Sequence, residues 1–198
     1  GEDVIREQKY PGAILTRISK SHIRIGTFQF AVIQEDKSLV NKLFNYTLER
    51  HFPNLLESKS KALDFLYAII EQQADLVTNW MRIGFIHGVM NTDNVALSGE
   101  TIDYGPCAFM DHYDPLTVFS SIDHQGRYSF ANQPIITQWN LARLAETILP
   151  LISDKHENAL KLAEEAINAY ADLYQSKWLD MMRLKIGLLT KENEDKDL

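Results

Sequence analysis

Residues 86–111 contain two short groups of polar side chains whose types suit phosphate and a divalent cation. The first group follows His87 and consists of Asp93 and Asn94. The second is Asp103, which ends a short apolar run and opens an Asp-Tyr-Gly triplet. Carboxylate and amide oxygens are the ligands that Mg²⁺ prefers, and a carboxylate beside a hydroxyl group can accept its proton. The pattern therefore predicts a site that handles nucleotide phosphates with the help of a metal ion.

The first group resembles the catalytic loop of small-molecule kinases with a protein-kinase-like fold, which often reads His-Gly-Asp-x-x-x-x-Asn. His87 and Asn94 fall in register with that loop, but Val89 occupies the position of the usual proton acceptor. A carboxylate stands instead at Asp93, directly before the Asn. This pattern indicates either a kinase fold that has lost its activity or one that performs different chemistry. The alternative is that Asp93 and Asn94 simply form a turn.

The Asp-Tyr-Gly order at Asp103 has the shape of the kinase Asp-Phe-Gly element, whose Asp binds magnesium. A lone Asp-x-Gly is a weak signal, but here it comes nine residues after Asn94, which is itself of metal-binding type. The alternative for Asp103 is a capping or turn aspartate.

Arg17 and Arg24 are the candidate phosphate-binding cations. On one continuous strand a spacing of seven would place their side chains on opposite faces, whereas the Ser-Lys-Ser break at residues 19–21 would let them converge. Guanidinium groups bind phosphate oxygens in a bidentate manner. From spacing alone, two unrelated surface arginines are the favoured interpretation.

Other side chains in the same stretch offer weaker possibilities. His87 is expected to support the backbone of its loop rather than to take part in catalysis. Cys107 is expected to be a buried thiol. A metal-hydrolase site is the least favoured alternative, because the spacing of its possible ligands matches no zinc pattern. Those ligands would be Asp111, His112, Asp114, Asp123 and His124.

Apolar residues recur at three- and four-residue steps in several segments, which predicts helices. We expect helices at about 36–50, 60–81, 139–152 and 155–188. Asp36 is the expected N-cap of the first helix, and Asp154 with Glu157 forms a possible capping box for the last.

The remaining segments are expected to be strands and loops. Residues 13–18, 22–25 and 28–33 carry β-type runs, so a strand-rich segment is expected over about 1–35. Residues 84–135 are rich in Gly, Asp, Asn and Pro, which predicts active-site loops between helical segments at 36–81 and 139–188. The expected fold class is α+β, mainly helical, in a single domain with short strands and a loop-rich nucleotide and metal site.

The composition excludes several classes of protein. The chain has 198 residues, of which 45% are hydrophobic, enough for one domain with a core. Its net charge of −7 argues against a surface that coats nucleic acid or an anionic membrane. No run of about 18 apolar residues is present, so no membrane-spanning helix is expected. A single cysteine excludes a disulfide within the chain and favours an intracellular compartment.

Several motifs together resemble the SelO family, also called YdiU, over nearly all of residues 1–145. Upstream motifs are Gly-Ala-Ile-Leu-Thr-Arg at 12–17 and Ser-His-Ile-Arg at 21–24. The others lie at 87–94, 101–106, 109–111, 113–115, 126–129, 132–134 and 139–144. The helices that follow fit less distinctively.

The resemblance implies a pseudokinase fold, of which this chain would form the protein-kinase-like C-terminal lobe. It implies transfer of AMP from ATP to Ser, Thr or Tyr hydroxyls of proteins, with ATP bound in the reverse orientation from kinases. Carried over by position, Asp93 would be the proton acceptor, and Asn94 and Asp103 would bind Mg²⁺, with Mn²⁺ as an alternative. Arg17, Arg24 and Asp103 would contact the nucleotide, which reverses the interpretation of the arginines from spacing alone.

Some family features are not found in these residues. The family's Gly-rich nucleotide-binding segment and phosphate-contacting Lys lie upstream, and its redox-active Cys or selenocysteine lies near the C-terminus. Together with the absence of an initial Met, this predicts a central portion of a longer protein, nearly inactive without the missing N-terminal lobe. The expected compartment is the bacterial cytoplasm, or the mitochondrion in a eukaryote. The runner-up function is a non-catalytic pseudokinase module that binds nucleotide or a partner protein, and a third is an ordinary kinase.

Overall fold

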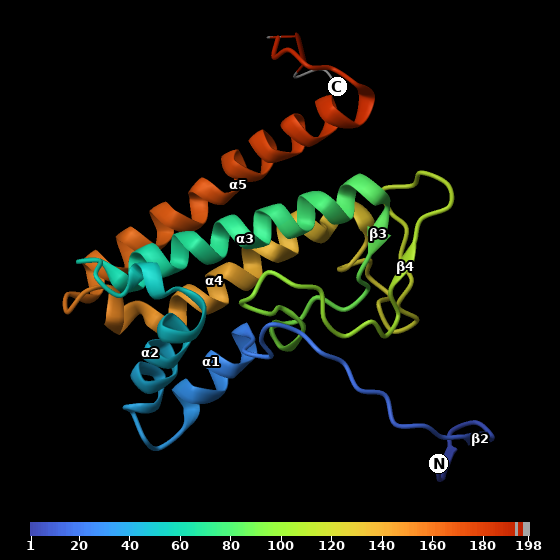
Figure 1. Cartoon of the computed structure of the whole chain (residues 1–198), viewed down its shortest axis with the longest axis horizontal. Coiled ribbons are helices and arrows are strands. Elements are labelled where there is room, and N and C mark those ends of the chain that lie inside the picture. Colours follow the sequence, from blue (N-terminus) through green and yellow to red (C-terminus); the bar gives the residue numbers. More distant parts are fainter. Residues whose placement is uncertain (193, 196–198) are drawn as a thin grey trace.

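The computed structural model describes residues 1–192, 194 and 195 and consists mainly of helices (Figure 1). The long helices are α3 (Lys61–Ile83), α4 (Gln133–Ile152) and α5 (His156–Ile186). The shorter helices are α1 (Ile25–Ile33) and α2 (Leu39–His51). Three single-turn 3-10 helices, η1 (Pro53–Leu55), η2 (Thr92–Asn94) and η3 (Phe130–Asn132), lie in the connections. The expected mainly helical α+β class is confirmed.

The core lies where the three long helices pack together. α3 buries side chains at three- and four-residue steps, among them Phe65, Leu66, Ile69 and Ile70. α4 contributes Leu141 and Leu144, which are fully buried in the same cluster. Gly84 ends α3 with a left-handed backbone at φ 70°, a conformation that glycine adopts at little cost. The chain therefore turns sharply at the base of α3 and enters the loops of the predicted site.

An aromatic cluster attaches the two short helices to α3. The Phe65 ring lies 5.3 Å from the Phe44 ring of α2 and 6.1 Å from the Phe28 ring of α1, measured between centroids. Phe52 packs edge-on against the same ring at 5.4 Å. Phe28 and Phe65 are completely buried. This cluster fixes the position of α1, whose first turn reaches the candidate site.

The strands are short and form two antiparallel pairs. β1 (Asp3–Ile5) pairs with β2 (Lys9–Pro11) in a hairpin that lies apart from the helices, at the end of an extended segment (Figure 1). β3 (Phe85–Ile86) pairs with β4 (Ala108–Phe109), with Phe85 opposite Phe109. The second pair brings the two ends of the 84–109 loop region together, so that its polar residues lie within one compact loop.

The strands expected at 13–18 and 28–33 are wrong, and 22–25 contains only an isolated β-bridge, between Arg24 and Ala96. Residues 12–23 contain no strand, and 25–33 form α1. The segment is rich in β-branched and aromatic residues, which favour strands as isolated residues. Ile25, Phe28 and Ala31 nevertheless recur at helical spacing and are all buried against the other helices. Tertiary packing therefore overrides the local preference.

The predicted helices exist, with shifted ends. Ser38 rather than Asp36 is the N-cap of α2, and Asp36 accepts hydrogen bonds from the backbone and hydroxyl of Ser38. α4 begins at Gln133, six residues before the expected start at 139. No side-chain cap hydrogen bond is formed at the start of α5, so the capping box at Asp154 is wrong.

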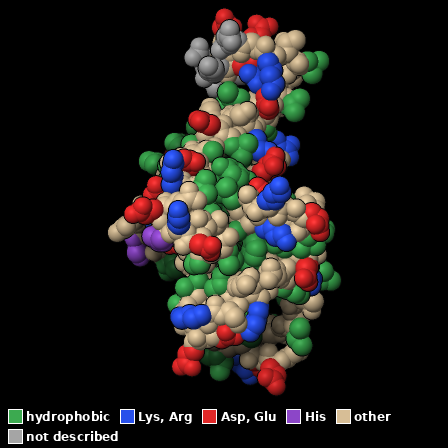
Figure 2. All heavy atoms as spheres, turned by 90° about the vertical axis from the view of Figure 1, so that its left-hand side faces the viewer, with side chains coloured by type: hydrophobic (Ala, Val, Ile, Leu, Met, Phe, Trp, Pro, Cys, Tyr) green, Lys and Arg blue, Asp and Glu red, His purple; other side chains and the backbone are tan. Residues whose placement is uncertain are grey.

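Near the C-terminus, residues 193 and 196–198 lie outside the described residues. Within the part that is described, Asp195 pairs with Arg183 at 2.5 Å. Figure 2 shows acidic and basic side chains interspersed with hydrophobic ones on one face of the molecule. No helix in the described residues has both the length and the apolar character needed to cross a membrane.

Candidate nucleotide and metal site

The turn that carries Asp93 and Asn94 is capped by a different residue. Asn91 is the N-cap of η2, and its Oδ1 accepts a hydrogen bond from the backbone N–H of Asp93 at 3.1 Å. The backbone N–H of Asn94 closes the turn on the carbonyl of Asn91 at 3.0 Å. The side chain that stabilises the turn is therefore that of Asn91, and not that of Asp93 or Asn94 as the turn interpretation assumed. Both of those side chains remain available for other partners.

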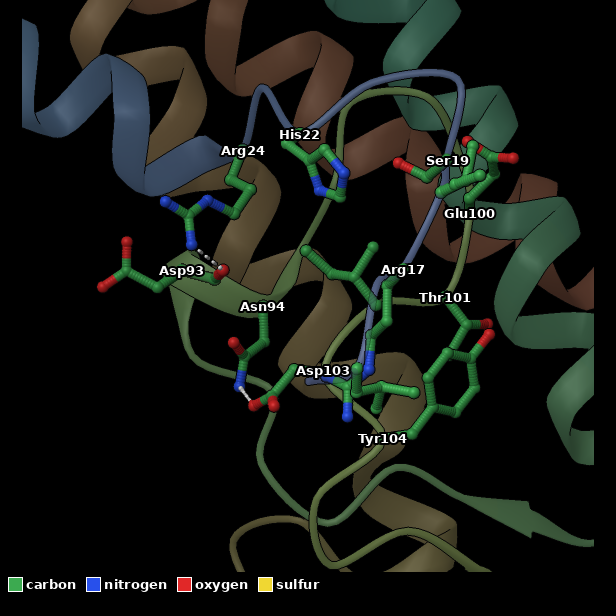
Figure 3. A pocket seen from close by; sticks show the side chains of 13 residues that line it. Arg17, Ser19, His22, Arg24, Asp93, Asn94, Glu100, Thr101, Asp103 and Tyr104 are labelled. Atoms are coloured by element: carbon green, nitrogen blue, oxygen red, sulfur yellow. Dashed lines mark hydrogen bonds between the residues drawn. The ribbon is translucent and has the colours of Figure 1, made fainter. Parts of the chain in front are cut away.

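Asn94 and Asp103 are joined by a direct hydrogen bond. Asn94 Nδ2 donates to Asp103 Oδ2 at 2.8 Å and to the carbonyl of Val89 at 2.9 Å. Figure 3 shows the two side chains pointing toward one another. Because both acceptors bind the amide nitrogen, they fix the orientation of the Asn94 amide group. The predicted pair of metal-binding residues is therefore brought together.

Asp103 has an unusual backbone. Its φ is 58°, and among the described residues it is the only non-glycine residue with a positive φ. Such a conformation costs of the order of 1 kcal/mol and persists where the surroundings impose it. The two preceding residues are held on both sides: Trp80 Nε1 donates to Thr101 Oγ1 at 2.9 Å, and His87 Nε2 bonds the Ile102 carbonyl at 2.8 Å. These bonds fix the direction in which the Asp103 carboxylate leaves the chain.

His87 is a supporting residue, as the sequence suggested. It is 1% exposed, and its Nδ1 accepts from the Val89 N–H at 3.3 Å, so Nε2 carries the proton given to Ile102. Burial lowers the pKa of His87 below its usual value, and this outweighs the opposite effects of the Ile102 carbonyl and the Asp103 charge. The ring is therefore held neutral and links the two halves of the loop.

The start of α1 is tied to the loop by a short ladder of hydrogen bonds. The Ile25 N–H donates to the Val95 carbonyl at 3.1 Å, and the Leu97 N–H donates to the Ile23 carbonyl at 2.9 Å. Arg24, the N-cap of α1, reaches across and donates from Nη1 to the Asp93 carbonyl at 3.2 Å. Its Nε is buried and has no hydrogen-bond partner among the described residues.

Arg17 and Arg24 line the same cavity as Asp93, Asn94 and Asp103. The cavity has a volume of about 830 Å³, within the range of pockets that hold small-molecule ligands. In Figure 3, Arg17 extends toward the part of the cavity where Asp103 lies. The structure thus places all five residues predicted for the site on the lining of one cavity.

The extended segment that carries Arg17 is held at one point by Glu100. Glu100 Oε2 accepts from the Lys20 backbone N–H at 2.8 Å and from Ser98 Oγ at 3.0 Å. Before this point in the chain, Leu15 is 74% exposed and Ile18 is 93% exposed. Glu100 is therefore one of the contacts that hold this segment over the cavity.

The Asp93 carboxylate lies on the opposite side of its turn from the Asn94 side chain (Figure 3). It still lines the shared cavity, near the guanidinium of Arg24. The Asp93 carboxylate and the Asn94–Asp103 pair therefore face different parts of the same cavity.

The alternative metal-hydrolase site is not formed. Among the described residues, no group of three or more His, Cys, Asp and Glu side chains is placed to hold a metal ion. Asp123 instead accepts the backbone N–H groups of Arg127 and Tyr128, and Asp114 accepts that of Leu116. These acids stabilise turns of the 111–129 loop. Cys107 is half-buried against the Val77 and Trp80 cluster, less buried than expected.

Sequence reasoning missed two residues that hold the site. Asn91 could have been found from the preference of asparagine for N-cap positions, directly before a short helical turn. Glu100 carries no such local signal, because its partner, the Lys20 backbone, lies 80 residues away in the sequence.

The oxygen atoms of the site are of the kind that bind a magnesium ion. Asn94 donates through its nitrogen, which leaves Oδ1 for another partner, and the described hydrogen bonds use only Oδ2 of Asp103. An amide and a carboxylate oxygen are hard ligands of the kind Mg²⁺ takes. Magnesium usually binds one or two protein groups and completes its shell with water and phosphate, so two side chains beside an open cavity are sufficient.

The family model for the protein adenylyltransferase SelO matches residues 1–198. The chain belongs to the SelO family. The match covers every residue of the site, so the geometry above is that of a SelO chain.

Individual proteins similar to this chain carry names that agree with the family match. A protein nucleotidyltransferase YdiU of Pelagibacter ubique is 58% identical over 198 residues, which are 100% of this chain and 41% of the relative. The proteins of the same name from Nitrosococcus oceani and Chromobacterium violaceum are each 56% identical, over 98% and 100% of this chain and 40% and 42% of their own lengths. The chain thus spans about two fifths of these curated SelO relatives.

Proposed function

We propose that this chain is the kinase-like lobe of a Mg²⁺-dependent protein adenylyltransferase, which transfers AMP from ATP to Ser, Thr or Tyr hydroxyls of other proteins. The observation that supports this most directly is that the hydrogen-bonded Asn94–Asp103 pair and Asp93 line one cavity. The family name, protein adenylyltransferase, and the relatives' name, protein nucleotidyltransferase, agree with it.

Each residue has a defined role in the proposal. Asn94 Oδ1 and a carboxylate oxygen of Asp103 hold the metal ion. When bound, Mg²⁺ would neutralise negative charge on the phosphates. Arg17 and Arg24 bind phosphate oxygens in the same cavity, because guanidinium donors match them in geometry and charge.

Asp93 accepts the proton of the acceptor hydroxyl. The hydroxyl oxygen then forms a bond to the α-phosphorus of ATP, the bond from that phosphorus to the bridging oxygen breaks, and pyrophosphate leaves. Val89 cannot serve as the proton acceptor, because its side chain has no basic atom. Asp93 lies in η2 and lines the cavity, and its carboxylate is not hydrogen-bonded to Asn94.

The test uses the full-length protein that carries this chain, ATP labelled at the α-phosphate, and a protein acceptor. We expect label in the acceptor and a mass increase that equals one adenylyl group. Asp103→Ala should abolish the transfer, whereas Asp111→Ala, at an exposed carboxylate of the neighbouring loop, should not. Equal transfer by wild type and Asp103→Ala would overturn the proposal. A mass increase that equals one phosphoryl group would indicate an ordinary kinase.

The second candidate is a non-catalytic module that binds nucleotide or a partner protein. The observation in its favour is that Val89 replaces the usual base and that the Asp93 carboxylate lies on the far side of its turn from Asn94. In that case the full-length protein would bind ATP with Mg²⁺ without turnover. Asp93→Ala would then leave its properties unchanged, whereas the enzyme hypothesis predicts loss of transfer with nucleotide binding retained.

A further inference from the structure

Gly26 lies where the first turn of α1 meets the turn that carries Asp93. A Cβ atom placed on Gly26 would overlap Asp93 Oδ1. It would lie 2.9 Å from Asp93 Cγ and 3.3 Å from Asp93 Cα. Real Cβ atoms essentially never come within 3.0 Å of another heavy atom in this way. The space that a side chain at position 26 would need is therefore the space that the Asp93 carboxylate fills.

The backbone of Gly26 does not itself require glycine. Gly26 lies inside α1 and is absent from the positive-φ glycines of the described residues, so alanine could adopt the same conformation. Glycine inside a helix is less stable than alanine, because it loses more freedom on folding. What glycine provides here is room for the neighbouring carboxylate.

The two segments cannot easily separate to admit a side chain. The Ile25–Val95 and Ile23–Leu97 backbone hydrogen bonds hold the start of α1 against the loop directly beside the contact. Arg24 Nη1 adds a third bond, to the Asp93 carbonyl. A methyl group at position 26 would therefore be accommodated mainly by rotation of the Asp93 side chain, which is the part of the contact that can move.

The position also suits a carboxylate electrostatically. The first turn of a helix carries unpaired N–H groups and a partial positive charge, which favour a negative side chain nearby. α1 has no acidic residue in its own first turn, so Asp93 supplies that charge from another segment. Steric fit and electrostatics thus favour the same orientation of the carboxylate.

We propose that Gly26 is a positioning residue, which keeps the Asp93 carboxylate seated against the first turn of α1 in the orientation it needs as proton acceptor. The inference rests on the proposed role of Asp93 in adenylyl transfer. It assigns Gly26 no contact with ATP, metal or acceptor, and any effect of its substitution must pass through Asp93.

The first test is a kinetic double-mutant cycle in the full-length protein with Gly26→Ala, Asp93→Ala and the double variant. We expect Gly26→Ala to lower kcat on the order of 100-fold, the usual effect of misplacing a catalytic group by about 1 Å, with little change in the KM for ATP. In the Asp93→Ala background the same substitution should change the remaining rate less than about twofold. Gln29→Ala, one turn further along α1, is the control and should keep wild-type kcat.

Three kinetic results would overturn the proposal. The first is unchanged kcat in Gly26→Ala, the second is the same fold-loss with and without Asp93, and the third is deterioration of kcat and KM together. If kcat and KM both deteriorate in Gly26→Ala, the substitution has disturbed the cavity as a whole and the positioning role is likewise wrong.

The second test does not depend on activity and measures hydrogen exchange of the α1 amides in the same four proteins. Alanine in place of glycine should slow local opening of α1 about two- to fivefold when nothing obstructs it. We expect that slowing only in the Asp93→Ala background, because the carboxylate obstructs the methyl group in the wild type. Equal slowing in both backgrounds would refute the steric contact. If instead Asp93→Ala transfers AMP normally while the coupling is present, the proposed role of Asp93 fails and the contact stands.

Discussion

At the scale of single residues, the site is organised by which hydrogen bonds its polar groups have already made. The Asn91 side chain caps the turn, and the Asn94 nitrogen is bound to two acceptors. The oxygens that remain belong to Asn94, Asp103 and Asp93, and all three residues line one cavity. The hydrogen bonds thus separate side chains of similar chemistry into those that support the turn and those whose oxygens remain available to a ligand.

Asn94→Asp should make stability depend on magnesium. The change replaces a donor that lies 2.8 Å from Asp103 Oδ2 with a second negative carboxylate. Without metal, we expect the unfolding free energy to fall by about 2 kcal/mol, from the loss of a hydrogen bond to a charged group and from repulsion. Added Mg²⁺ should restore part of this, because it binds only the folded state. Thermal unfolding with EDTA and with Mg²⁺ measures both effects.

Asn45→Asp is the matched control, since it makes the same charge change on the exposed surface of α2. We expect it to show neither the loss nor the magnesium dependence. A destabilisation of Asn94→Asp that Mg²⁺ fails to reduce would contradict a metal site at this pair.

His87 should make the fold sensitive to mild acid. Because burial lowers its pKa in the folded state, the unfolded chain takes up a proton first as the pH falls. The stability that neutral His87 provides is therefore complete above its ordinary pKa of 6.5 and is lost as the pH falls through its lower pKa in the folded state.

Unfolding measured from pH 7.5 to pH 5 should show this slope in the wild type. His87→Gln should be less stable at pH 7.5 but have a flatter slope, and His124→Gln, at an exposed histidine, should retain the wild-type slope.

At the scale of elements, helical periodicity predicted the long helices, because α3 and α5 repeat their apolar residues over many turns. It failed for α1, whose nine residues are too few and too β-branched to outweigh a strand pattern. The site residues of the loop were identified from their types and spacing. Their supports were not, since Glu100 and Gly26 act on segments about 70 to 80 residues away in the chain. Such contacts follow from tertiary packing, which local patterns do not encode.

Phe65→Ala should show how far α1 depends on the aromatic cluster. The Phe65 side chain is completely buried between the rings of Phe28, Phe44 and Phe52. Removing it leaves a cavity, and we expect the unfolding free energy to fall by about 3–5 kcal/mol. Tyr67→Ala, at a position 43% exposed in the same helix, should cost less than about 1 kcal/mol. Denaturant unfolding measures both, and similar losses for the two variants would show that the cluster does not anchor α1.

At the scale of the whole molecule, the loop over 93–104 forms one side of the cavity, and the segment over 12–23 lies across it with little cover. Ile14 is 97% exposed and Ile18 is 93% exposed, which is unusual for isoleucine. The chain accounts for 41% of the length of its Pelagibacter ubique relative. We therefore expect these side chains and the open side of the cavity to be covered by other parts of the longer protein.

The 198 residues on their own should transfer AMP at a rate at least on the order of 100-fold below that of the full-length protein, because an ATP molecule held on one side is poorly oriented. Labelled transfer by equal concentrations of the two proteins measures the difference. Circular dichroism of the short chain is the control for folding. Transfer by the short chain at a rate close to the full-length value would show that these residues already contain the complete catalytic site.

Trp80 gives the site a natural optical probe. Its indole is 8% exposed, its N–H is bound to Thr101, and its ring lies 5.5 Å from that of His87. Fluorescence of an indole responds to its hydrogen bond and to the charge of an adjacent imidazole, so emission from Trp80 depends on the segment that leads into Asp103. The chain has two other tryptophans, Trp139 and Trp178, and their replacement by phenylalanine would leave one emitter. Occupation of the cavity could then be followed in solution without attaching a dye.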